Sequence, residues 1–146
     1  MRRIYNDEAL YDNWLKRVEK NGIEGLSNFY SNLVIRFIKD MALGVNVAKS
    51  SKKGARSKKR LNALKQKVIF VMKGLEERGL KDITKLKAET VHKFFEEMRD
   101  GTILNRYGKP YLSTGDYIKD FKAFWHWYQK TMGKEGIAVL DITDEL

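Results

Sequence analysis

The 146-residue sequence contains no cysteine and a single proline, Pro110. Without cysteine the chain can form neither disulfides nor a thiolate metal site. Its two histidines, His92 and His126, are far apart in the sequence and have no carboxylate pattern around them. We therefore expect no bound metal and no other cofactor. Proline and alternating strand-like runs are both scarce, which favours an all-α fold.

Long apolar runs are also missing. No run approaches the roughly 20 residues that a helix needs to span a bilayer. The first ten residues include Asp7 and Glu8 and lack the apolar region of a signal peptide. Apolar residues make up 42% of the chain, enough for a single core. We expect a globular chain in the cytoplasm, at the nucleoid, with no membrane partner.

Acidic residues are absent between Asp40 and Glu76, and the same stretch is rich in basic residues. Its ten basic residues are Lys49, Lys52, Lys53, Arg56, Lys58, Lys59, Arg60, Lys65, Lys67 and Lys73. They account for the whole net charge of +10, because the basic and acidic residues elsewhere cancel. A charge concentrated in this way is typical of a surface that binds a polyanion, with nucleic acid ahead of membrane or acidic protein.

The apolar spacing predicts five helices, over residues 7–20, 27–43, 56–78, 88–99 and 113–130. Asn6 is the expected N-cap of the first helix, and glycines follow the first four helices. The predicted inward face of the first helix is Leu10, Tyr11, Trp14, Leu15 and Val18. We expect three regions: an N-terminal helix over 1–22, a domain over 23–132, and a linker or edge strand over 133–146.

The motifs of common enzymes are absent from the sequence. There is no glycine-rich phosphate loop, His-x-x-x-His pair, cysteine nucleophile or Gly-x-Ser-x-Gly elbow. The carboxylate pairs Glu76–Glu77 and Glu96–Glu97 fit solvated helix faces better than acid–base chemistry, and His126 fits a core or half-buried imidazole. We predict that this polypeptide is not an enzyme by itself.

The basic run has two interpretations, a solvated face or a ligand-binding surface. Ten cations without an anion repel one another, which favours a polyanionic partner. Arg56, Lys58, Lys59 and Arg60 also open the third helix, where the helix dipole disfavours each cation by about 0.3–1 kcal/mol and favours an anion. We expect Lys58, Lys59 and Arg60 to lie off the apolar seam and to be free for phosphate.

The start of the fifth helix is a second candidate surface. Ser113 is the expected N-cap, with Asp116 at the spacing of an acidic capping box, and Arg106 and Lys109 precede it. Free amides at a helix start can hold an anion. A plain N-cap without any ligand explains the same residues equally well.

From Ser27 to Lys130 the order of features resembles the N-terminal core-binding domain of tyrosine recombinases, the phage-integrase family. The resemblance rests on a long helix that starts with basic residues, the link Leu80-Lys81-Asp82-Ile83-Thr84, and a last helix that follows Ser113-Thr114 with regularly spaced aromatics. It implies a SAM-like four-helix bundle, here with an additional N-terminal helix. That leading helix, with Trp14, resembles integrases of the archaeal type.

The resemblance implies a DNA-binding half-clamp that works with the catalytic domain of the same recombinase and with other protomers on double-stranded DNA. The family's nucleophilic tyrosine belongs to the catalytic domain, so no tyrosine here is assigned that role. The candidate DNA-binding residues are Lys52, Lys53, Arg56, Ser57, Lys58, Lys59, Arg60, Lys65, Arg106, Lys109, Ser113 and Thr114. The alternatives are a fragment of a complete recombinase, or a stand-alone basic helical adaptor that binds RNA or an acidic protein.

Overall fold

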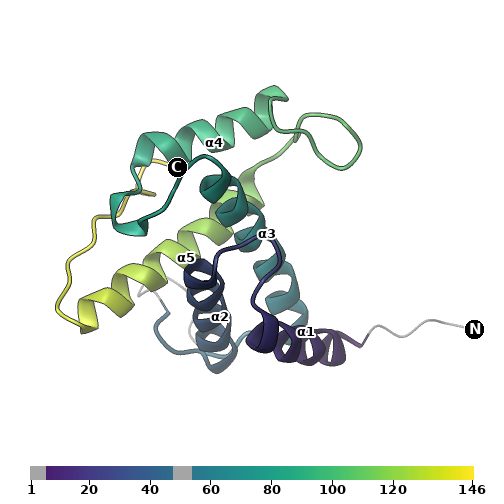
Figure 1. Cartoon of the computed structure of the whole chain (residues 1–146), viewed down its shortest axis with the longest axis vertical. Coiled ribbons are helices and arrows are strands. Elements are labelled where there is room, and N and C mark those ends of the chain that lie inside the picture. Colours follow the sequence, from purple (N-terminus) through teal and green to yellow (C-terminus); the bar gives the residue numbers. More distant parts are fainter. Residues whose placement is uncertain (1–5, 48–53) are drawn as a thin grey trace, which may run out of the picture.

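The computed structural model describes residues 6–47 and 54–146 and is all-α, as predicted (Figure 1). Its elements are α1 (Asp7–Asn21), α2 (Asn28–Leu43), α3 (Lys58–Glu77), the 3-10 helix η1 (Ile83–Lys85), α4 (Ala88–Asp100) and α5 (Gly115–Lys134). The part of the chain so described contains no strand. None of its helices has the length and apolarity of a membrane span.

The predicted starts of α1 and α2 are confirmed, and both have side-chain caps. The side chain of Asn6 accepts a hydrogen bond from the backbone N–H of Ala9 at 3.0 Å, and Ser27 caps α2 in the same way. At the other end of α2, Gly44 adopts a left-handed conformation with φ of 74°, which a residue with a Cβ disfavours. Short polar side chains and glycine therefore define these boundaries.

Helix α3 is the centre of the arrangement. It contacts α1, α2, α4 and α5, whereas α1 contacts only α2 and α3 extensively within the described chain. Figure 1 shows α4 at one end of α3 and α1 near the other. Helices α2 to α5 are compatible with a four-helix bundle to which α1 is added.

The core is the set of apolar faces that the helical spacing predicts. The α3 seam is fully buried, and it comprises Leu61, Leu64, Val68, Val71 and Leu75. Aromatic rings fill the space between α2 and α5, where Phe37 lies 5.4 Å from Phe124 and 5.5 Å from Trp127 between ring centroids. The prediction for Leu10 is wrong, because its side chain is 52% exposed while Tyr11, the next residue, turns inward.

The last ten residues fold back along α5 and form no strand, so the expectation of an edge strand is wrong. The indole Nε1–H of Trp125 donates to the carbonyl oxygen of Leu140 at 2.9 Å, and Thr143 is completely buried. The indole of Trp125 on α5 therefore satisfies a backbone carbonyl group that a neighbouring strand would otherwise satisfy.

The contact between α3 and α4 gives the first testable prediction. A Cβ built on Gly74 would lie 2.1 Å from Cε1 of Phe94, so Gly74→Ala overpacks the core and should lower the free energy of unfolding by about 1–3 kcal/mol. A Cβ built on Gly133 in α5 would meet no neighbouring atom, so Gly133→Ala should instead raise the free energy of unfolding by about 0.5 kcal/mol. Urea unfolding of both variants measures the difference; equal stabilities would contradict the packing described.

Candidate nucleic-acid interface

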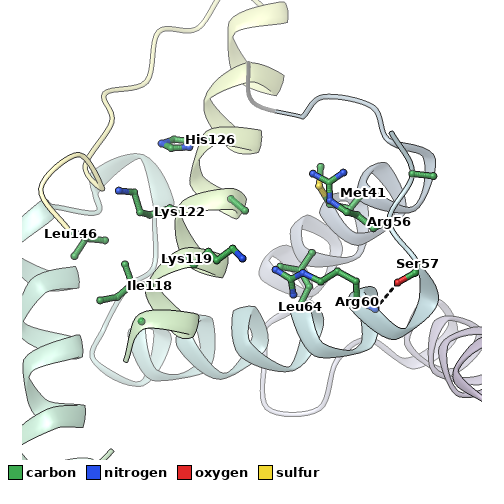
Figure 2. Close-up of a pocket in the computed structure, with 13 residues that line it drawn as sticks. Met41, Arg56, Ser57, Arg60, Leu64, Ile118, Lys119, Lys122, His126 and Leu146 are labelled. Atoms are coloured by element: carbon green, nitrogen blue, oxygen red, sulfur yellow. Dashed lines mark hydrogen bonds between the residues drawn. The ribbon is translucent and has the colours of Figure 1, made fainter. Parts of the chain in front are cut away.

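The start of α3, the first half of α5, the end of α2 and the C-terminal segment surround an open pocket of about 770 Å³ (Figure 2). Four basic side chains line it, Arg56 and Arg60 from the α3 side and Lys119 and Lys122 from α5. Gly115, the first residue of α5, lies on its wall. The two helix starts that the sequence singled out as separate surfaces therefore meet at one pocket.

Local structure fixes the basic residues on each wall. The backbone N–H of Arg56 donates to the carbonyl oxygen of Met41 at 3.1 Å, which ties the approach to α3 to the end of α2. Ser57 then caps α3 by accepting from the N–H of Arg60 at 3.1 Å, as the predicted helix start requires. On α5, Lys119 and Lys122 are three residues apart and so share one helix face.

Arg60 makes a bidentate ion pair with Asp120 across α3 and α5. Nη2 lies 2.5 Å from Oδ1 and Nη1 lies 3.3 Å from Oδ2. The side chain of Asp120 is 3% exposed and that of Arg60 is 36% exposed. Contrary to the expectation that Arg60 is free for phosphate, its guanidinium is already paired with a buried carboxylate.

Asp120 was not predicted as a partner, although the sequence contains a signal for it. It is an acidic residue on the face of α5 that also carries Phe121 and Phe124, both fully buried. A charged group on such a face is retained in a folded protein only when it is paired. Lys119 and Lys122, also absent from the predicted site, lie beside Asp120 in the sequence and line the pocket themselves.

Two of the predicted DNA-binding lysines point towards α1. The Nζ of Lys58 lies 4.2 Å from the ring centroid of Tyr11 and 3.8 Å from Oδ1 of Asp12. The Nζ of Lys65 lies 5.1 Å from the ring centroid of Trp14. Burial, helped by the nearby Arg17, lowers the pKa of Lys65. Both lysines cover aromatic rings of the added helix and do not line the pocket.

The start of α5 differs from the prediction by one residue. Thr114, and not Ser113, is the N-cap, and it makes no side-chain capping bond. Thr114 is buried and its Oγ1 accepts from Nη1 of Arg99 at 3.0 Å, while Oγ of Ser113 accepts from the N–H of Gly115 at 3.4 Å. The hydroxyl of Ser113 thus accepts from the backbone two residues further along the chain, so the predicted capping box between Ser113 and Asp116 does not form.

The loop before α5 presents the exposed residues Arg106 and Lys109 away from the pocket. The side-chain oxygen of Asn105 accepts from the backbone N–H groups of Tyr107 and Lys109, at 2.8 and 3.2 Å. The guanidinium of Arg106 lies 5.1 Å from the ring centroid of Tyr107. Figure 1 shows this loop projecting beyond the bundle beside α4.

Three predicted DNA-binding residues remain, Lys52, Lys53 and Lys59. Lys59 is exposed at the start of α3, and Lys52 and Lys53 lie outside the described residues.

His126 is half-buried, as expected, and its Nε2 lies 3.0 Å from Oδ2 of Asp141. The described ranges, 6–47 and 54–146, contain no group of three or more histidine, aspartate or glutamate side chains that could hold a metal ion.

The chemistry of the pocket is that of anion binding. Guanidinium and ammonium groups bind phosphate oxygens through charge-assisted hydrogen bonds, and the apolar residues Met41, Leu64 and Ile118 also line the pocket. Comparisons of the chain with family models, curated proteins and solved structures find no match. Function is therefore inferred from the residues and their geometry.

The two neighbouring basic residues at the start of α3 should respond differently to mutation. Arg60→Ala leaves the Asp120 carboxylate buried and unpaired and should cost about 2–3 kcal/mol, below the range for a fully buried pair because Arg60 is partly exposed. Lys59→Ala, the matched control, should change stability by less than about 0.5 kcal/mol. Thermal unfolding compares them. Equal melting temperatures would show that the ion pair does not support the fold.

Proposed function

We propose that this chain binds double-stranded DNA, mainly through its phosphates. One open pocket carries the proposal, because it is lined by Arg56 just before α3, by Arg60 on α3 and by Lys119 and Lys122 on α5. Duplex DNA presents about one negative charge per 1.7 Å of axis, so clustered cations gain affinity by releasing its counterions. Phosphate contacts of this kind position a protein on DNA without reading its sequence.

The pairing within the pocket supports a phosphate-binding role. Asp120 neutralises part of the charge of Arg60 and holds its guanidinium in one orientation. About a third of the Arg60 side chain stays exposed. Lys119 and Lys122 have their own access to the same space. A guanidinium already held in place loses less conformational freedom when it binds phosphate than a free side chain does. The exposed residues Lys59, Arg106 and Lys109 would add contacts further out.

We further propose that the chain is the core-binding domain of a tyrosine recombinase. The support is the all-α fold with an added N-terminal helix, together with the sequence resemblance over residues 27–130. In this proposal the chain supplies DNA binding for integration and recombination, and strand cleavage belongs to the catalytic domain of the same recombinase. Other protomers on the DNA would be further partners, and the protein would act at the nucleoid.

A stand-alone basic adaptor for RNA or an acidic protein would use the same cations. A-form RNA presents a deep, narrow major groove and a wide, shallow minor groove, so a surface shaped for B-form DNA should favour DNA. Competition between duplex DNA and duplex RNA of equal length and sequence separates the two proposals. Stronger displacement by RNA would favour the adaptor.

The dependence of binding on salt tests the phosphate contacts. If the domain makes about five of them, the slope of log K against log salt should be near −4.5, so affinity should be measurable at low salt and weak at physiological salt. Fluorescence anisotropy with a labelled duplex at several salt concentrations gives the slope. Binding that does not depend on salt, or no binding at low salt, would refute the proposal.

The α5 wall of the pocket gives a test by mutation. Lys119→Ala with Lys122→Ala should weaken DNA binding and reduce the salt slope by about two, because each lysine neutralises one phosphate in this proposal. Lys16→Ala with Lys20→Ala removes the same charge from exposed positions on α1 and is the control. If the two double variants bind DNA equally, net charge and not the pocket determines the affinity.

A further inference from the structure

Residues 137–146, here named the acidic strap, run beside the pocket. They contain Asp141, Asp144 and Glu145 and no basic residue. The strap is not helical, yet it holds a defined position against α5. It therefore brings negative charge to a basic part of the molecule.

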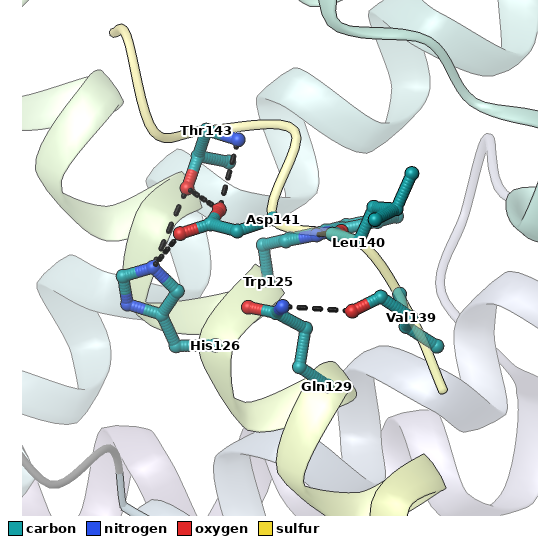
Figure 3. A network of polar contacts seen from close by, with 7 residues as sticks. All are labelled: Trp125, His126, Gln129, Val139, Leu140, Asp141 and Thr143. Carbon is teal, nitrogen blue, oxygen red and sulfur yellow. Dashed lines mark hydrogen bonds and ion pairs between the residues drawn. The ribbon is translucent and has the colours of Figure 1, made fainter. Parts of the chain in front are cut away.

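Polar groups on α5 hold the strap at successive residues (Figure 3). The Nε1–H of Trp125 donates to the carbonyl oxygen of Leu140 and the amide of Gln129 donates to that of Val139, both at 2.9 Å. These bonds satisfy the backbone of an extended segment without a neighbouring strand. The strap is thus a docked segment with its own binding site on α5.

Asp141 is the centre of the attachment. Its Oδ1 accepts from the N–H and the hydroxyl of Thr143 at 2.9 and 2.6 Å, and its Oδ2 lies 3.0 Å from Nε2 of His126. Burial alone would raise the pKa of Asp141, but the hydrogen bonds from Thr143 and His126 together lower it. The strap is therefore held with this carboxylate in its charged form at neutral pH.

The strap shares the edge of the cationic pocket. His126, which contacts Asp141, lines the pocket, and so does Leu146 of the strap itself. Lys122 is four residues before His126 and lies on the same face of α5. Figure 2 shows Leu146, Ile118 and Lys122 along one side of the pocket. A phosphate that enters from this side meets the strap.

We propose that the acidic strap is an intramolecular competitor of DNA, which closes one end of the cationic pocket and is displaced when the duplex binds. This inference rests on the proposed function and adds a regulatory step to it. In the closed state the strap's carboxylates screen Lys122 and its neighbours. In the open state the whole α5 wall is available to phosphates.

The way the strap is held suits displacement. Leu140 is 85% exposed and Ile137 is 50% exposed, whereas Val139, Ile142 and Leu146 are only partly buried against the core. Only Thr143 is fully buried among the strap residues. Segments whose apolar side chains are at most partly buried open at a lower cost than the global unfolding of a protein. A phosphate backbone can therefore compete for the pocket without disturbing the helical core.

The test releases the strap without changing the net charge. Gln129→Ala with Thr143→Val removes the side-chain bond to Val139 and the hydroxyl bond to Asp141, and Asn32→Ala, an exposed amide on α2, is the neutral control. If the strap is closed about nine-tenths of the time, its release should raise DNA affinity by about five- to tenfold. Anisotropy at one fixed low salt concentration measures the affinity. The amide and Trp125 indole signals in NMR spectra report whether the strap is docked.

The parent protein supplies a second measurement that needs no mutation. Titration with duplex DNA should move the Trp125 indole signal towards its position in the released variant. The strap proposal is refuted if the parent binds DNA while that signal stays in place, or if release leaves the affinity unchanged. If neither the parent nor the released variant binds DNA at low salt, the proposed function itself fails. Binding by the released variant alone would support both proposals.

Discussion

The ion pair between Arg60 and Asp120 is the interaction on which the arrangement of the basic surface depends. It joins the first turn of α3 to the second turn of α5. A carboxylate that is 3% exposed needs a charged partner, and Arg60 supplies it from the other helix. Arg60 lines one pocket with Arg56 and the α5 lysines, so a pairing that the fold requires also orders part of the proposed binding surface.

The basic side chains at and just before the start of α3 point in two directions and make different contacts. Lys58 and Lys65 cover the rings of Tyr11 and Trp14 on α1, where their alkyl chains contribute packing and their charges contact aromatic faces. Arg56 and Arg60 face the pocket. A basic run that looks uniform in the sequence therefore contacts the added helix on one side and lines the pocket on another.

The fold could be predicted from the sequence because apolar spacing determines which helix faces are buried. The α3 seam from Leu61 to Leu75 and the caps at Asn6 and Ser27 are local patterns. The pairing of Arg60 with Asp120 joins residues 60 positions apart, and spacing within one helix does not reveal it. The same limit applies to Thr114, whose hydroxyl accepts from Arg99 on α4 and so leaves Ser113 outside the cap.

The strap shows why net charge by itself is a poor guide to such a surface. The chain carries +10, yet Asp141 of the acidic strap contacts His126, which lines the same pocket as Lys122. A tethered anion acts at a high effective concentration, so it screens neighbouring cations more than free acidic residues elsewhere would. The strap is attached through hydrogen bonds, through Asp141 and through the partly buried side chains of Val139, Ile142 and Leu146, so the balance between closed and open states is set by these local contacts. In this proposal the affinity for DNA depends on that local equilibrium as much as on the number of basic residues.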